Sequence, residues 1–155
     1  MLVAALAVLL VATLAVGGVL GQKVWSNHQD EQGRDAAAGA ASKAAALVLS
    51  YDYRRLKQNF AAARATLTPD FATKFDATTK VVGDQAVKTK ATVKADVREV
   101  SVSNSSPDVV NVLLFVNQTT TSTVTQGKPR VDMNRARFTM VRSGNGWLVQ
   151  EVAGL

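Results

Sequence analysis

The chain of 155 residues carries few of the side chains on which enzymes usually depend. It contains no cysteine and a single histidine, His28, which lies in a polar stretch after an apolar N-terminal segment. Zinc, thiol and Ser-His-Asp chemistry therefore lack their usual components. The sequence predicts no enzymatic activity, no cofactor and no metal site, and we interpret His28 as an exposed side chain close to a membrane.

Two carboxylates, Asp132 and Glu151, lie in or beside predicted strands and are the strongest candidates for acid–base chemistry. A carboxylate buried inside a cone-shaped domain can act as a general base, because desolvation raises its pKa. The alternative is a charge on a strand face that pairs with Arg135, Arg137 or Lys128, and the sequence favours this alternative.

The chain is basic, with a formal net charge of +6. Its basic residues alternate with acidic ones, which is typical of a solvated face, and no nucleic-acid recognition motif is present. The sequence therefore predicts no nucleic-acid partner. Basic residues concentrate in the middle of the chain, where they suit either a solvated face or anionic headgroups; these are Lys74, Lys80, Lys88, Lys90, Lys94 and Arg98.

The N-terminal segment decides the class of the protein. From Leu2 to Leu20 there is no charged residue, and about 20 apolar residues in a helix span the hydrocarbon core of a bilayer. We predict a transmembrane helix over residues 1–22, with Trp25 at the headgroup boundary. Small residues on this helix allow close packing against other membrane helices, and with Trp25 they form the predicted membrane interface: Ala4, Ala7, Ala12, Ala15 and Gly18.

A cleaved signal peptide is the competing interpretation, with a cleavage site at Ala15-Val16-Gly17. The apolar run is longer than a signal core and no basic region precedes it, so we favour the membrane helix. The positive-inside rule leaves the topology open, because few charges flank the segment.

After the membrane segment, helical patterns precede strand patterns. Residues 23–50 are rich in alanine and predict a juxtamembrane helix whose apolar face is Ala40, Ala44, Leu47 and Tyr51. A second helix is predicted to start at an Asp52 cap. A third starts at Thr68, with Pro69 and Asp70 in its first turn.

Beyond residue 90 the apolar period changes from helical to alternating. The alternation changes parity across Arg98-Glu99, which predicts a β-bulge. Val109–Thr119 is apolar on both faces and predicts a central strand, and strands over Val131–Arg142 and Trp147–Val152 follow around a glycine-rich turn. Helices followed by strands predict an α+β domain over residues 51–155, with helices packed on an antiparallel sheet of about four strands.

An ordered series of short segments resembles the actinobacterial Mce-associated membrane proteins. The series runs from Ser50-Tyr51-Asp52-Tyr53 to Gly146-Trp147-Leu148-Val149, and together with the apolar segment it covers nearly the whole chain. The positions that carry the resemblance are Tyr51, Asp52, Tyr53, Pro69, Asp70, Phe71, Asn117, Gln118, Thr119, Pro129, Arg130, Asp132 and Trp147.

The resemblance implies a single-pass protein of the inner (plasma) membrane, with a cytoplasmic N-terminus and a periplasmic domain like nuclear transport factor 2 or cystatin. It also implies a non-catalytic accessory subunit of an ATP-driven Mce lipid importer for fatty acids or sterols. Its partners would be the permease and Mce-domain subunits, with membrane lipids around the helix.

Two other functions fit the same architecture. One is a membrane-anchored scaffold of another envelope machine, similar to a type IV secretion subunit. The other is a small-ligand binder or isomerase-like enzyme that uses the cavity of the cone, with Asp132 pointing inward. A cavity filled by Phe71, Phe75, Phe115 and Trp147 would argue against the second alternative.

Overall fold

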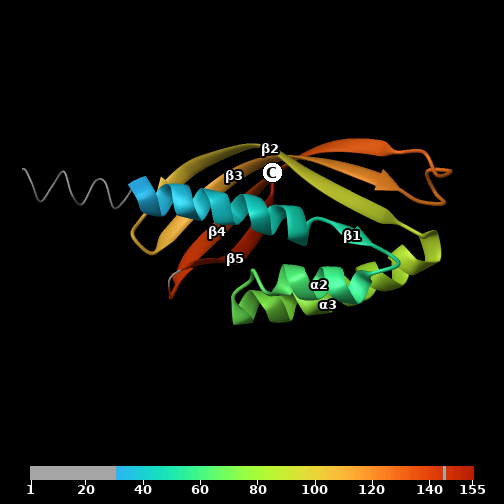
Figure 1. Ribbon diagram of the computed structural model, residues 1–155, viewed down its shortest axis with the longest axis horizontal. Coiled ribbons are helices and arrows are strands. Elements are labelled where there is room, and N and C mark those ends of the chain that lie inside the picture. Colours follow the sequence, from blue (N-terminus) through green and yellow to red (C-terminus); the bar gives the residue numbers. More distant parts are fainter. Residues whose placement is uncertain (1–30, 145) are drawn as a thin grey trace, which may run out of the picture. The chain divides into compact units, whose positions relative to one another are not determined.

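The computed structural model describes residues 31–144 and 146–155 (Figure 1). In this part of the chain, no helix has both the length and the apolar character needed to cross a bilayer. The predicted transmembrane helix over residues 1–22 lies outside the described residues. So do the other predicted features of the N-terminal region: Ala4, Ala7, Ala12, Ala15, Gly18, Trp25 and His28.

Five antiparallel strands form one sheet in sequential order, β1-β2-β3-β4-β5, which confirms the predicted α+β meander. The sequence predicted four strands and missed β1, because two residues are too few to show an alternating pattern. The strand bounds are Tyr51–Asp52 (β1), Thr92–Ser105 (β2), Val109–Thr121 (β3), Arg130–Ser143 (β4) and Gly146–Gly154 (β5).

The register of the sheet confirms two predictions about its longest strands. The pairing of β2 with β3 shifts between Val97 and Glu99, so a bulge lies at Arg98 as predicted. β3 is the middle strand of the five, as its apolar character on both faces indicated. Alternate residues of β3 from Val110 to Val116 are buried and face the helices.

Residues 31–48 are helical, and the helix packs on the sheet through alanines rather than through its larger side chains. Ala37, Ala41, Ala44 and Ala45 are buried in the core, whereas Leu47 on the predicted face is exposed. Alanine side chains let a helix backbone lie close to a sheet, so the close-packed face need not contain the bulky residues.

The compact unit begins at Arg34 and ends at Leu155. The alanine-rich helix, which the sequence analysis assigned to a separate juxtamembrane segment, therefore contributes core residues to the same unit as the strands. Its buried alanines share one hydrophobic cluster with β3 residues such as Val112 and Leu114.

The two remaining helices are α2 (Leu56–Arg64) and α3 (Pro69–Thr89). The start of α3 is as predicted: Thr68 Oγ1 accepts from the amide of Phe71, Pro69 is the first helical residue, and Asp70 lies in the first turn. The predicted cap of α2 is wrong. Asp52 belongs to β1, and α2 begins four residues later without a side-chain cap.

Large apolar side chains fill the space between the helices and the sheet. Phe138, Leu114 and Met140 are the largest fully buried side chains of the described residues. Of the four aromatic residues whose packing there would argue against a ligand-binding cavity, Phe71, Phe75 and Trp147 pack against this core. Phe115 does not, because it lies on the opposite face of β3, where it is 38% exposed.

Candidate functional site

The residues of the Ser50–Tyr53 segment form a network of hydrogen bonds at the edge of the sheet. The carboxylate of Asp52 accepts from the Arg54 amide (2.9 Å), from Arg54 Nε (3.0 Å) and from the terminal nitrogen of the same guanidinium (2.7 Å). These bonds hold the pKa of Asp52 down at about 2, mainly through the Arg54 side chain and then through its amide. Asp52 is therefore an ionised structural residue.

Side chains of neighbouring elements attach this edge to the rest of the domain. Asn59 Oδ1 accepts from the amide of Asp52 (3.0 Å), which links β1 to α2. Ser50 Oγ accepts from the amide of Ala95 (2.8 Å) in β2. Gln118 donates to the carbonyl of Leu49 (3.1 Å) at the end of helix 31–48. The Ser50–Tyr53 and Asn117–Thr119 segments therefore lie close together, and their hydrogen bonds attach helix 31–48 to the sheet.

Aromatic rings continue from this edge toward α3. The ring of Tyr51 lies 6.3 Å from that of Phe60, which makes an edge contact with Phe75 at 6.1 Å. Burial raises the pKa of the Tyr51 hydroxyl. Because these rings pack on one another, they stabilise the position of α2 against β1 and α3.

The other positions of the resemblance have local roles, although Asp132 lies opposite Gln118 in the register of β3 and β4. Pro69, Asp70 and Phe71 form the first turn of α3. Trp147 lies under the guanidinium of Arg142, at 4.6 Å from the ring centre. Pro129 precedes β4. The structure therefore distributes these residues among caps, turns and strands, as expected for positions that maintain a fold.

The two candidate acid–base residues are both accessible to solvent. Asp132 pairs with Arg130 (2.9 Å), and its side chain is 42% exposed. An ion pair on the strand face was predicted correctly, but with other partners. Asp132 pairs with Arg130 instead, since residues two apart on a strand share a face. Glu151 is exposed on β5. Asp132 shares a face of β4 with the buried Ala136 and Phe138, but it lies near the start of the strand, where it is accessible to solvent. The described residues contain no group of three potential metal ligands.

The outer face of the sheet, opposite the helices, carries exposed apolar side chains that were not among the predicted site residues. On β3 these include Phe115, and on β4 they include Met133, which is 86% exposed. Phe115 pairs with Arg135 and Asn117 with Met133, so the two apolar side chains are diagonal neighbours on one face. Val109 and Val131 extend the row along the same strands. We call Val109, Phe115, Val131 and Met133 the outer apolar row.

A signal for this row was present in the sequence. Val109–Thr119 is apolar on both faces, which predicted a strand covered on both sides. In the structure the helices cover one side of β3, and no described element covers the other. The second apolar face therefore remains partly exposed, most clearly at Val109 and Phe115.

Comparison with known proteins gives relatives in one genus and structural neighbours in others. No known family profile matches the chain. Two proteins of Mycobacterium tuberculosis, described as the uncharacterized proteins MT1407 and Rv1362c, are each 32% identical over 148 residues, covering 92% of this chain and 67% of the relative. The chain belongs to the family of these mycobacterial proteins.

Solved structures share the fold at low sequence identity. The periplasmic domain of DotI has a TM-score of 0.66 at 14% identity, over 78% of this chain and 94% of that domain. An IcmL-like type IV secretion system protein from Legionella pneumophila has a TM-score of 0.64 at 13% identity, over 76% and 88%. The VirB8 protein of Agrobacterium tumefaciens gives 0.59 at 12% identity, over 80% and 92%. At such identities the likeness establishes the α+β fold alone.

Proposed function

We propose that this protein is a non-catalytic scaffold subunit of a machine in the cell envelope, with its domain on the periplasmic side of the inner membrane. The observation that carries the proposal is the outer apolar row on β3 and β4, which is exposed although it crosses the middle of the sheet. An apolar row of this kind suits contact with a partner subunit better than contact with water.

The interior of the domain supports a binding role over a catalytic one. Phe138, Leu114 and Met140 fill the space that a cone-shaped ligand binder or isomerase needs for its cavity. Asp132, the carboxylate assigned to such a cavity, is 42% exposed and pairs with Arg130. These placements favour a scaffold over the isomerase-like alternative.

Two kinds of machine are compatible with this role. Structural neighbours from type IV secretion, such as the IcmL-like protein, favour a subunit of a secretion-like assembly. The ordered segments from Ser50-Tyr51-Asp52-Tyr53 to Gly146-Trp147-Leu148-Val149 favour an accessory subunit of an Mce-type lipid importer. The scaffold role is common to both and does not depend on which machine is present.

Affinity purification of the full-length chain in mild detergent, followed by mass spectrometry, tests the proposal. We expect stoichiometric recovery of other envelope subunits. Permease, ATPase and Mce-domain proteins would identify a lipid importer, whereas secretion components would identify the second kind of machine. Recovery of the chain alone, at native expression and after gentle cross-linking, would contradict the scaffold role.

A paired set of variants tests whether the outer apolar row is the contact. Phe115→Glu with Met133→Glu places two charges on the row and should reduce partner recovery at least tenfold. Val81→Glu is the matched control, since Val81 is an exposed valine on α3 away from this face. Equal recovery with the double variant and the control would show that the partner binds elsewhere.

A further inference from the structure

One end of the domain combines unpaired lysines with a projecting apolar side chain. Lys88 and Lys90 lie at the end of α3, Lys94 at the start of β2, and Lys128 in the loop between β3 and β4. All four side chains are exposed. Within the described part of the chain, none of them forms an ion pair with a carboxylate.

Hydrogen bonds bring these segments together. Thr123 donates through its amide (2.8 Å) and its hydroxyl (3.0 Å) to the carbonyl of Thr89, which joins the β3–β4 loop to the end of α3. Thr92 of β2 pairs with Thr121, the last residue of β3. The four lysines therefore surround one loop, and we call them, with Val124, the basic pole.

Val124 lies in this loop and is 76% exposed. The loop is held in shape from within, because Ser122 and Thr125 exchange hydrogen bonds between side chain and backbone (2.9 and 3.2 Å), and Ser122 is buried. Its backbone reaches positive φ at Gln126 as well as at Gly127. An ordered loop that presents an apolar side chain to water suggests that a partner covers this side chain.

From these observations we propose that the basic pole binds the surface of an anionic lipid bilayer. Lysine is a compact charge on a flexible stem, which suits a surface of many mobile phosphates better than the fixed bidentate geometry preferred by arginine. Val124 enters the boundary between headgroups and acyl chains, while the surrounding lysines contact the phosphates. Asp52, Asp96 and Asp132 are each paired with an arginine. Asp84 lies one helical turn before Lys88 on α3, so Lys90, Lys94 and Lys128 carry most of the charge of the pole.

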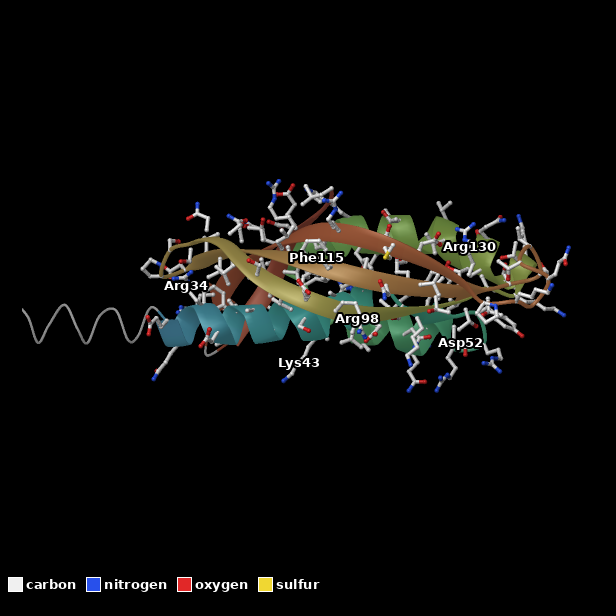
Figure 2. All side chains as sticks on the ribbon, turned by 90° about the horizontal axis from the view of Figure 1, so that it is seen from above. Arg34, Lys43, Asp52, Arg98, Phe115 and Arg130 are labelled. Atoms are coloured by element: carbon white, nitrogen blue, oxygen red, sulfur yellow. The ribbon has the colours of Figure 1, made fainter. Side chains whose placement is uncertain are left out.

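The pole lies at the opposite end of the compact unit from Arg34. Figure 2 shows Arg34 at one end and Asp52 and Arg130 at the other. The helical path from Arg34 to Leu49 accounts for about 22 Å of this separation, at a rise of 1.5 Å per residue. The proposed lipid contact is thus remote from Arg34, where the compact unit begins.

Vesicle binding by the full-length chain, held in nanodiscs of neutral phosphatidylcholine, tests the proposal. We expect the nanodiscs to sediment with vesicles of phosphatidylglycerol and phosphatidylcholine in equal parts, but not with vesicles of phosphatidylcholine alone. Each well-placed lysine contributes about fivefold to such binding, so Lys90→Gln, Lys94→Gln and Lys128→Gln together should weaken it about a hundredfold. Binding should also weaken as salt is added.

Two controls keep the result specific. Lys43→Gln, Lys74→Gln and Lys80→Gln remove the same net charge elsewhere and should leave most of the binding intact. Val124→Asp should abolish it, whereas Val81→Asp should not. The proposal is overturned if neutral vesicles bind equally well, if both triple variants lose binding alike, or if a purified partner subunit rather than lipid responds to the pole variants. Thermal unfolding of each variant verifies that it is folded.

Discussion

Replacing Asp52 by asparagine tests whether the β1 edge is held together by charge. The pKa of this carboxyl falls from 3.8 to about 2 in the folded chain. A shift of about 1.8 units corresponds to roughly 2.4 kcal/mol of stabilisation at neutral pH. The side chain of Asp52 is only 10% exposed, but that of Arg54 is 67% exposed, so solvent screening reduces the expected value to about 1–2 kcal/mol.

Because the folded state lowers this pKa, the stabilisation is complete above the unfolded value near pH 4 and disappears as the pH falls toward 2. Asp52→Asn should therefore lower the midpoint of thermal unfolding by roughly 3–8 °C at pH 7 and by almost nothing near pH 2. Circular dichroism of the full-length chain in mild detergent, followed from pH 7 to pH 2, measures the difference between the two proteins.

Asp96→Asn is the matched control for this experiment. Asp96 pairs with Arg98 at 3.0 Å, as Asp52 pairs with Arg54, but both partners are exposed on β2. Exposed pairs contribute little, so the control should change the unfolding midpoint only slightly. If Asp52→Asn costs no more than the control, or if its cost is the same at pH 2 as at pH 7, the assigned role of the Asp52 charge is wrong.

Two further substitutions test the cap and the core. Thr68→Ala should destabilise the domain by about 0.5–2 kcal/mol, because it removes the acceptor for the Phe71 amide; Thr73→Ala within the same helix should cost less, and chemical denaturation measures both. Leu114→Ala should cost about 2–5 kcal/mol by opening a cavity in the core, whereas Phe115→Ala on the exposed face should cost much less. Similar losses for Leu114→Ala and Phe115→Ala would contradict the assignment of the two faces of β3.

Sequence patterns predicted correctly those structural features that depend on a few neighbouring residues. The cap at Thr68, the bulge at Arg98 and the central position of β3 all follow from a few neighbouring residues, and the structure contains each of them. The long strands were also predictable, because alternation over many residues identifies a strand whatever its partners are.

Elements that depend on distant contacts could not be predicted in the same way. β1 has two residues and exists because Tyr51 and Asp52 pair with Val93 and Thr92, some forty residues later. The sequence therefore indicated a helix cap at Asp52, because a carboxylate that accepts from a nearby amide is found both at helix caps and in turns. The basic pole also cannot be recognised from neighbouring residues in the sequence, because it combines residues from α3, β2 and the β3–β4 loop.

The alanine-rich helix connects the fold to the proposed scaffold role. A helix that packs through alanines lies close to the sheet, and Gln118 fixes its end by donating to the Leu49 carbonyl. The helix is thus fastened to β3, the strand that carries Phe115 on its other face. Because an alanine face leaves no space for larger side chains, Ala41→Leu should push the helix from the sheet, destabilise the domain and weaken partner binding together. A protein whose partner contact survived that displacement would not use β3 as its binding surface.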